Sequence, residues 1–168
     1  MESSRRSLLA VYLNDHLAGA TAGTQLLRRA ARRHRDDAIG RELGELAREV
    51  AQDRRSLQRI MSDLGLPRQR LRIVAGWAGE RAVRIKPNGR LIRRSPLSDL
   101  IDVEAMRLGV EGKAAAWRTL ADLAADEHRL KSDDLYRLLH RAERQAEVLE
   151  RLRRQSAARA WGATEASD

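Results

Sequence analysis

The sequence contains no cysteine and no phenylalanine, and only 3% of its 168 residues are aromatic. Without cysteine the chain cannot form a disulfide framework, an iron–sulfur cluster, a thiolate zinc finger or a thiol nucleophile. The scarcity of aromatic residues argues against a β-sandwich or a β-barrel, because strands favour aromatic and β-branched side chains. The hydrophobic content of 42% comes mostly from Ala, Leu and Val. This composition favours an all-α fold.

Long apolar runs are also missing. No stretch approaches the eighteen or so apolar residues that a membrane-spanning helix needs. The segment from Arg5 to Val11 looks like the start of a signal peptide, but Asn14 and Asp15 interrupt its apolar run. We therefore expect a cytoplasmic protein that does not enter a membrane. Its length fits one domain.

Apolar residues at helical spacing predict two long amphipathic helices in the N-terminal half. The second helix has the clearer stripe: Ile39, Leu43, Leu46, Val50, Asp53, Leu57, Ile60 and Leu64. The first helix has a similar stripe: Leu9, Leu13, His16, Ala20, Gly23, Leu27 and Ala30. Each stripe is interrupted by one polar residue, Asp53 or His16.

The C-terminal half predicts two more helices. One should begin near Ser95–Ser98, with Ser98 as its N-cap, and its expected inward residues are Leu97, Ile101, Glu104, Leu108, Glu111 and Ala115. The other should begin at Ser132, and its expected inward residues are Leu135, Leu138, Ala142, Gln145, Leu149 and Leu152. We assign residues 1–155 to a single bundle and residues 156–168 to a flexible C-terminal tail.

A crossover of about thirty residues connects the second and third helices, and turn-forming segments open it at Gly65–Pro67 and close it at Lys86–Gly89. A weaker stripe of Leu71, Val74, Ala78 and Ala82 predicts a short helix within this crossover. The chain is therefore expected to consist of two helical hairpins joined by one long connection.

This organisation resembles the ferritin-like superfamily, and the segments Tyr12–Gly19 and Leu108–Lys113 are similar to segments of uncharacterised bacterial ferritin-like proteins. The resemblance covers roughly Leu8 to Leu152. It implies an up-down-down-up four-helix bundle with a short crossover helix. It also implies a di-iron centre built from one Glu on each of two helices and a Glu-x-x-His pair on each of the other two.

Matching residues at equal heights in the two hairpins predicts one buried polar layer, formed by His16, Asp53, Glu111 and Gln145. Glu49 lies one helical turn from Asp53. The layer departs from the di-iron pattern, because His16 stands where the first helix would offer Glu and the fourth helix has no Glu-x-x-His pair.

Two interpretations of this layer remain open. The one we favour is a hydrogen-bonded network in which His16 pairs with Asp53 and an arginine neutralises Glu111. The alternative is a single iron, manganese or zinc ion held by His16, Asp53 and Glu111, with Glu49 nearby. Only the second interpretation would require a cofactor.

Small residues are concentrated near this layer: Ala18, Gly19, Ala20, Ala22 and Gly23 on the first helix, and Gly109 and Gly112 on the third. Glycine within a helix costs about 1 kcal/mol relative to alanine, so these positions indicate a packing or access requirement. We expect close helix packing. A ligand pocket is the alternative.

Lys and Arg total 33 against 24 Asp and Glu, a formal charge of +9. In the expected topology, ten arginines meet at one end of the bundle: Arg28, Arg29, Arg32, Arg33, Arg35, Arg93, Arg94, Arg151, Arg153 and Arg154. Such a surface can attract an acidic protein or a polyanion.

The sequence contains neither a nucleophile elbow nor a glycine-rich phosphate loop, so no reaction can be named. We expect a small interaction or stress-associated protein without the usual di-iron centre. The alternatives are a metal-dependent oxidoreductase and a nucleic-acid-binding protein, and assembly into a homo-oligomer is left open.

Overall fold

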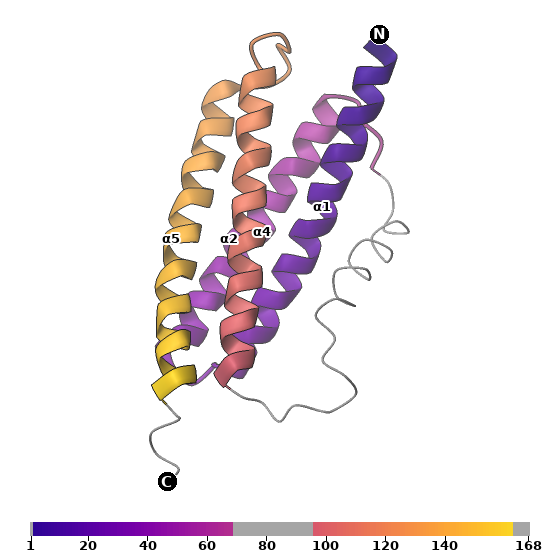
Figure 1. Ribbon diagram of the computed structural model, residues 1–168. Coiled ribbons are helices and arrows are strands. Elements are labelled where there is room, and N and C mark those ends of the chain that lie inside the picture. The colour runs from indigo at the N-terminus through magenta and orange to yellow at the C-terminus, as the bar shows by residue number, and fades with distance from the viewer. Residues whose placement is uncertain (1, 69–95, 163–168) are drawn as a thin grey trace.

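The computed structural model describes residues 2–68 and 96–162, and every regular element in these two ranges is an α-helix. The four helices are α1 (Glu2–Arg33), α2 (Ala38–Asp63), α4 (Pro96–Leu123) and α5 (Ser132–Gly162), and they form an elongated bundle (Figure 1). The predictions of an all-α fold and of a four-helix bundle are confirmed. The short helix predicted between Leu71 and Ala82 lies outside the described residues, as do the last residues of the chain, 163–168.

Contacts between side chains establish the directions of the helices. α1 and α4 are antiparallel, because the Tyr12 hydroxyl lies 3.4 Å from Oγ1 of Thr119 while Arg33 pairs with Asp102 two-thirds of a helix away. The turn at residues 34–37 makes α1 and α2 antiparallel as well. α2 and α4 therefore run in the same direction, and α2 ends at the opposite end of the bundle from the start of α4 (Figure 1).

Both ends of α2 carry local stop signals. At its start, the Asp37 carboxylate accepts a hydrogen bond from the Gly40 amide at 2.9 Å, which satisfies one of the free N–H groups of the first turn. At its end, Gly65 has a φ of 63°, a conformation that glycine adopts without a steric penalty. The Arg6 guanidinium then donates to the carbonyl oxygens of Leu64 and Gly65 at 3.1 and 2.9 Å.

The core lies along the bundle axis, and the inward stripes expected for α2 and α5 are largely buried. In α5 the buried residues include all six that were expected. In α4 the expected stripe is wrong, since Leu97, Ile101 and Leu108 are exposed. The face that packs in the core consists of Leu100, Val103, Met106, Val110, Ala114, Ala116, Trp117 and Leu120. α4 carries apolar residues on both faces, so spacing alone could not select the buried one.

Two predicted boundaries also need correction. Ser98 is not an N-cap, because α4 already begins at Pro96, a residue well suited to the first turn of a helix. The predicted boundary at residue 155 is wrong as well, because α5 continues to Gly162 and Ser156 is buried. Alanines between Ser156 and Trp161 favour this extension, since alanine has the highest helix propensity.

In the described ranges, no helix has the length and apolar character needed to cross a membrane.

Candidate functional site

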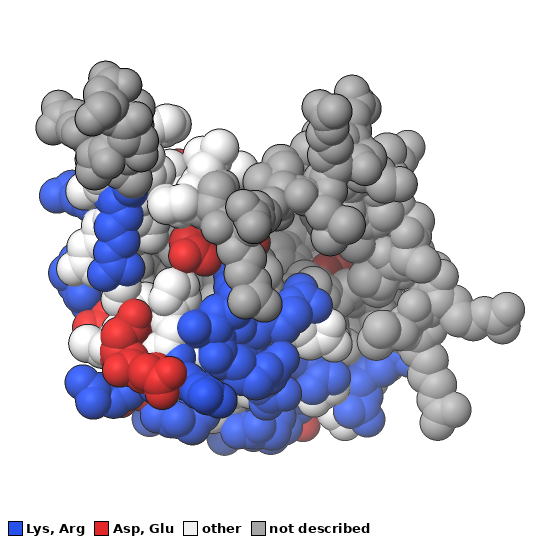
Figure 2. Space-filling model, turned by 90° about the horizontal axis from the view of Figure 1, so that it is seen from below, with Lys and Arg blue, Asp and Glu red and all other residues white. Residues whose placement is uncertain are grey.

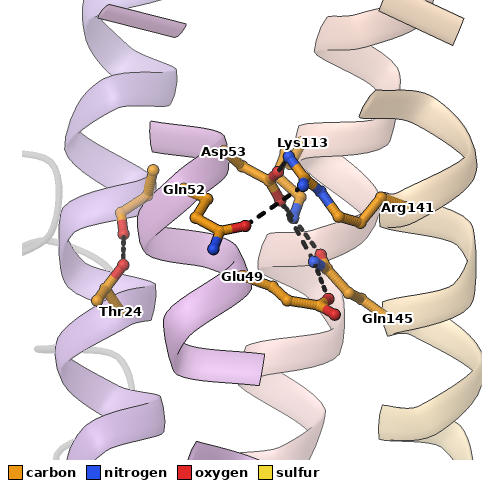
Figure 3. Close-up of polar contacts among 8 residues, drawn as sticks. Thr24, Glu49, Gln52, Asp53, Lys113, Arg141 and Gln145 are labelled. Atoms are coloured by element: carbon orange, nitrogen blue, oxygen red, sulfur yellow. Dashed lines mark hydrogen bonds and ion pairs between the residues drawn. The ribbon is translucent and has the colours of Figure 1, made fainter. Parts of the chain in front are cut away.

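A buried charged cluster occupies the middle of the bundle, where α2, α4 and α5 meet (Figure 3). Asp53 on α2 is only 1% exposed. Its Oδ2 accepts a hydrogen bond from Nζ of Lys113 on α4 at 2.5 Å, and its Oδ1 forms an ion pair with the guanidinium of Arg141 on α5. One carboxylate is thus held between two cations from two other helices, which supplies the partners that a buried charge requires.

Gln145 on α5 extends the cluster. Its Oε1 accepts a hydrogen bond from Lys113, and its Nε2 donates to Oε2 of Glu49 at 2.7 Å and to Oδ2 of Asp53 at 3.3 Å. Two carboxylates and two cations balance one another around this amide. We call Glu49, Asp53, Lys113, Arg141 and Gln145 the Asp53 cluster.

Burial lowers the pKa of Lys113 below its usual value, and the neighbouring Asp53 carboxylate opposes that shift. α1 contributes no side chain to the hydrogen bonds and ion pairs described for the Asp53 cluster. Its residue Thr24 instead donates to the carbonyl oxygen of Ala20 on the same helix at 2.7 Å (Figure 3). The Asp53 cluster therefore links α2, α4 and α5, and α1 takes no part in its polar contacts.

The structure brings together two members of the predicted layer, Asp53 and Gln145, along with neighbouring Glu49. His16 is half-buried, and its ring packs edge to face against Tyr12 with 4.6 Å between the ring centroids. Among the described residues no hydrogen bond or ion pair joins His16 to Asp53. Burial lowers the pKa of His16, and Asp15 partly counteracts this effect.

The prediction for Glu111 is wrong. Its side chain is 48% exposed and lies 3.7 Å from Arg107, one turn earlier on the same helix. Because the buried face of α4 differs from the expected one, Lys113 enters the cluster instead. The sequence contained one indication of Lys113. It is a lysine in a chain whose other cations are nearly all arginine, with Lys86 and Lys131 as the other two lysines.

The sequence suggested four candidate metal ligands, and the structure does not arrange them around a common point. They are His16, Glu49, Asp53 and Glu111. Within residues 2–68 and 96–162, no three His, Asp or Glu side chains form a group able to hold a metal ion. Both oxygens of Asp53 face cationic groups, which would repel a metal ion. The same geometry does not fit the di-iron centre that the ferritin-like resemblance implies.

Many of the predicted basic residues gather at the end of the bundle that carries the α1–α2 turn (Figure 2). Several are neutralised by acids of the same end: Arg33 by Asp99 and Asp102, Arg151 by Glu42, Arg153 and Arg154 by Glu150, and Arg35 by Asp36. Arg28, Arg29 and Arg32 are exposed, and no ion pair is found for them among the described residues. Arg93 and Arg94 lie outside those residues.

At the glycines of α1 and α4 the two helices do not pack closely, contrary to the expectation. A Cβ atom built on Gly19, Gly23, Gly109 or Gly112 would meet no atom of the described residues within 4 Å. These glycines instead line an open pocket of about 610 Å³ between α1 and α4, to which α2 also contributes residues. His16, Asp53 and Lys113 also line this pocket, which places it beside the Asp53 cluster.

No protein-family model matches the sequence, and neither a curated protein nor a solved structure shows a significant match.

Proposed function

We propose that this protein is a small interaction protein, a ferritin-like bundle without a di-iron centre that binds an acidic protein surface at its arginine-bearing end. The observation that carries the proposal is the exposure of Arg28, Arg29 and Arg32, which have no ion-pair partner among the described residues. An acidic partner would supply the missing counter-charges, and complementary charge accelerates association.

An exposed aromatic residue at the same end supports a protein partner. Trp161, in the last turn of α5, is 64% exposed, and Arg159 precedes it by two residues. Tryptophan and arginine are the residues most enriched among the energetic hot spots of protein interfaces. Trp161 can provide an apolar anchor, while the arginines provide charge complementarity.

The Asp53 cluster supports an interaction protein over a metal-dependent oxidoreductase. Its carboxylates are already engaged by Lys113, Arg141 and Gln145. A metal ion would have to displace these cationic partners and leave them buried without counter-ions. The cluster acts instead as an internal connection that specifies how three helices meet.

Binding to poly-L-glutamate, a simple acidic polypeptide, tests the proposal. The double variant Arg28→Glu/Arg32→Glu should bind it much more weakly than the unaltered protein. Arg5→Glu/Arg55→Glu makes the same change in net charge at exposed sites away from this end and should have a small effect. Equal losses from the two variants would indicate attraction by net charge alone and would overturn the proposal.

A second measurement separates an acidic protein from a nucleic acid. Duplex DNA should bind more weakly than poly-L-glutamate at the same salt concentration. Affinity for DNA that exceeds affinity for the polypeptide and falls steeply with salt would show phosphate binding instead, because neutralising each phosphate releases counter-ions. That result would contradict an acidic protein as the partner.

A further inference from the structure

The neighbouring helices α1 and α4 share an exposed apolar face on either side of the open pocket (Figure 1). Five of the seven large apolar side chains exposed in the described ranges belong to these two helices: Leu8, Val11, Leu97, Ile101 and Leu108. Leu108 is 74% exposed and lines the pocket, so it stands at the rim. Apolar side chains gathered on one surface mark an interaction site, because burying them removes apolar area from water.

Two charges on this α1–α4 face have no counter-charge. Asp15 and Arg29 on α1 are exposed and line the pocket, and no ion pair is found for either among the described residues. Arg54 also lines the pocket, but its Nε donates a hydrogen bond to Oγ1 of Thr21 at 2.9 Å. Asp15 and Arg29 are about four helical turns apart, so they lie on one side of α1 and are about 20 Å too distant to pair within one chain.

Contacts between α1 and α4 establish which of their residues lie at equal heights. Near one end of the face Tyr12 contacts Thr119, and near the other end Arg33 pairs with Asp102. The midpoint between these contacts falls at residues 22–23 of α1 and at residues 110–111 of α4. The middle of the face is therefore defined on both helices.

A two-fold axis that crosses the helices at this height makes the face complementary to itself. It lays α1 of a second copy antiparallel on α1, and α4 of the second copy antiparallel on α4. Asp15 of one copy then lies opposite Arg29 of the other, since Ala22 is seven positions from each. On α4 the same axis brings Leu108 opposite Ala115, because these two residues are nearly equally far from the midpoint. One axis thus pairs the charges of α1 and the apolar side chains of α4, as an isologous interface requires.

The residues near the axis and the size of the face are suitable for a dimer. Gly19 and Ala22 are small and exposed, which allows the α1 helices of two copies to approach closely. From Leu8 to Arg29, α1 is about 30 Å long, and two neighbouring helices are about 20 Å wide. The face therefore measures about 600 Å² per copy, and the pair would bury about 1,200 Å², the lower end of the range for stable interfaces.

We propose that the α1–α4 face is a homodimer interface, in which two copies pack antiparallel about a two-fold axis at Ala22. Two ion pairs between Asp15 and Arg29 flank the axis. Leu108 of each copy packs on Ala115 of the other. A second copy is the partner that this face fits, because the face itself supplies both members of each contact.

This interface is distinct from the acidic partner proposed above. It uses Arg29 and does not use Arg28 or Arg32. The variant Arg28→Glu/Arg32→Glu should therefore lose binding to poly-L-glutamate and still dimerise, so each proposal can fail without affecting the other.

Because the chain has no cysteine, a single introduced cysteine tests the axis directly. Ala22→Cys should form a disulfide-linked dimer on mild oxidation, because each copy meets its own equivalent at the axis and a disulfide needs Cα atoms within about 7 Å. Ala105→Cys is the matched control, an exposed alanine of the same face whose two copies would lie about 18 Å apart along the helices. Non-reducing electrophoresis measures the cross-linking. Equal cross-linking of the two variants, or none by Ala22→Cys, would overturn the proposal.

Charge reversal tests the ion pairs. The unaltered full-length chain should form a dimer in sedimentation equilibrium. Asp15→Arg and Arg29→Asp should each weaken the dimer by about tenfold, because each places like charges opposite one another at two symmetric positions. Combining them restores opposite charges and should return the dissociation constant to within about threefold of the original. A combined variant as weak as the single variants would contradict the assigned pairing.

The apolar contact is tested by Leu108→Glu, which should leave the chain monomeric at concentrations where the unaltered chain is a dimer. Tyr136→Glu on α5 makes the same change in charge at an exposed apolar residue outside the face and should still dimerise. Equal losses from these two variants would exclude the α1–α4 face as the interface. An unaltered chain that stays monomeric at every concentration would mean that another segment or another protein covers this face, and would also overturn the proposal.

Discussion

Nζ of Lys113 lies 2.5 Å from Oδ2 of Asp53, although sixty positions separate the two residues in the sequence. The Asp53 side chain is 1% exposed and that of Lys113 is 11% exposed. The contact joins α4 to α2, which lie in different hairpins. Because each charge is buried with the other, removing either one alone leaves an uncompensated charge in the interior.

Replacing Asp53 with alanine should therefore destabilise the fold by about 3 to 5 kcal/mol. The double variant Asp53→Leu/Lys113→Leu should lose much less than the sum of the two single changes, because neither charge remains unpaired. Urea denaturation of the single and double variants measures this coupling. Strictly additive losses would contradict a direct interaction between the two side chains.

Stability should depend on the protonation of His16 in mildly acidic solution. Burial lowers the pKa of His16 below 6.5, so the unfolded chain binds a proton more readily than the folded one. The free energy of unfolding should consequently decrease as pH falls from 6.5 toward the lower pKa of the folded state. Urea midpoints should show this decrease, and His16→Gln should reduce it. His140→Gln, which changes an exposed histidine, is the control.

Two glycines should respond in opposite ways to the same substitution. A Cβ on Gly40 would lie 1.8 Å from the backbone oxygen of His34, so Gly40→Ala should disturb the α1–α2 turn and cost roughly 1 to 3 kcal/mol. At Gly109 a Cβ meets no atom within 4 Å in the part of the chain that the structure describes, and Gly109→Ala should stabilise the protein by up to about 1 kcal/mol. Thermal denaturation distinguishes the two. A stabilising Gly40→Ala would contradict the geometry of the turn.

The Glu150 carboxyl should titrate at unusually low pH. Hydrogen bonds from Arg153 and then Arg154 lower its pKa from 4.5 to about 2. The stability that the ionised carboxylate contributes is fully present above 4.5 and is lost as pH falls toward 2. Carboxyl chemical shifts measured by NMR give the pKa directly. Arg153→Gln should raise it toward the ordinary value, and a pKa near 4.5 in the unaltered protein would exclude the assigned ion pairs.

Periodicity in the sequence predicted the helices, and it identified the buried faces of α2 and α5 because each has polar residues on the opposite side. The stripe containing Asp53 and the stripe containing Gln145 both enter the core, and the two residues are in contact. Where one face of a helix is clearly apolar, burial follows from local sequence alone. These features depend on local sequence and require no tertiary contact.

The tertiary structure decided which face of α4 is buried, a choice that the local sequence pattern left open. α4 has two apolar faces, and only packing selected the one that contains Trp117, turning Lys113 inward and Glu111 outward. The partners of Asp53 depend on that rotation, since a lysine and an arginine from two other helices now neutralise it. The sequence alone likewise does not decide the role of the glycines of α1 and α4, because glycine permits both close helix packing and open space. The separation of these two helices left an open pocket there.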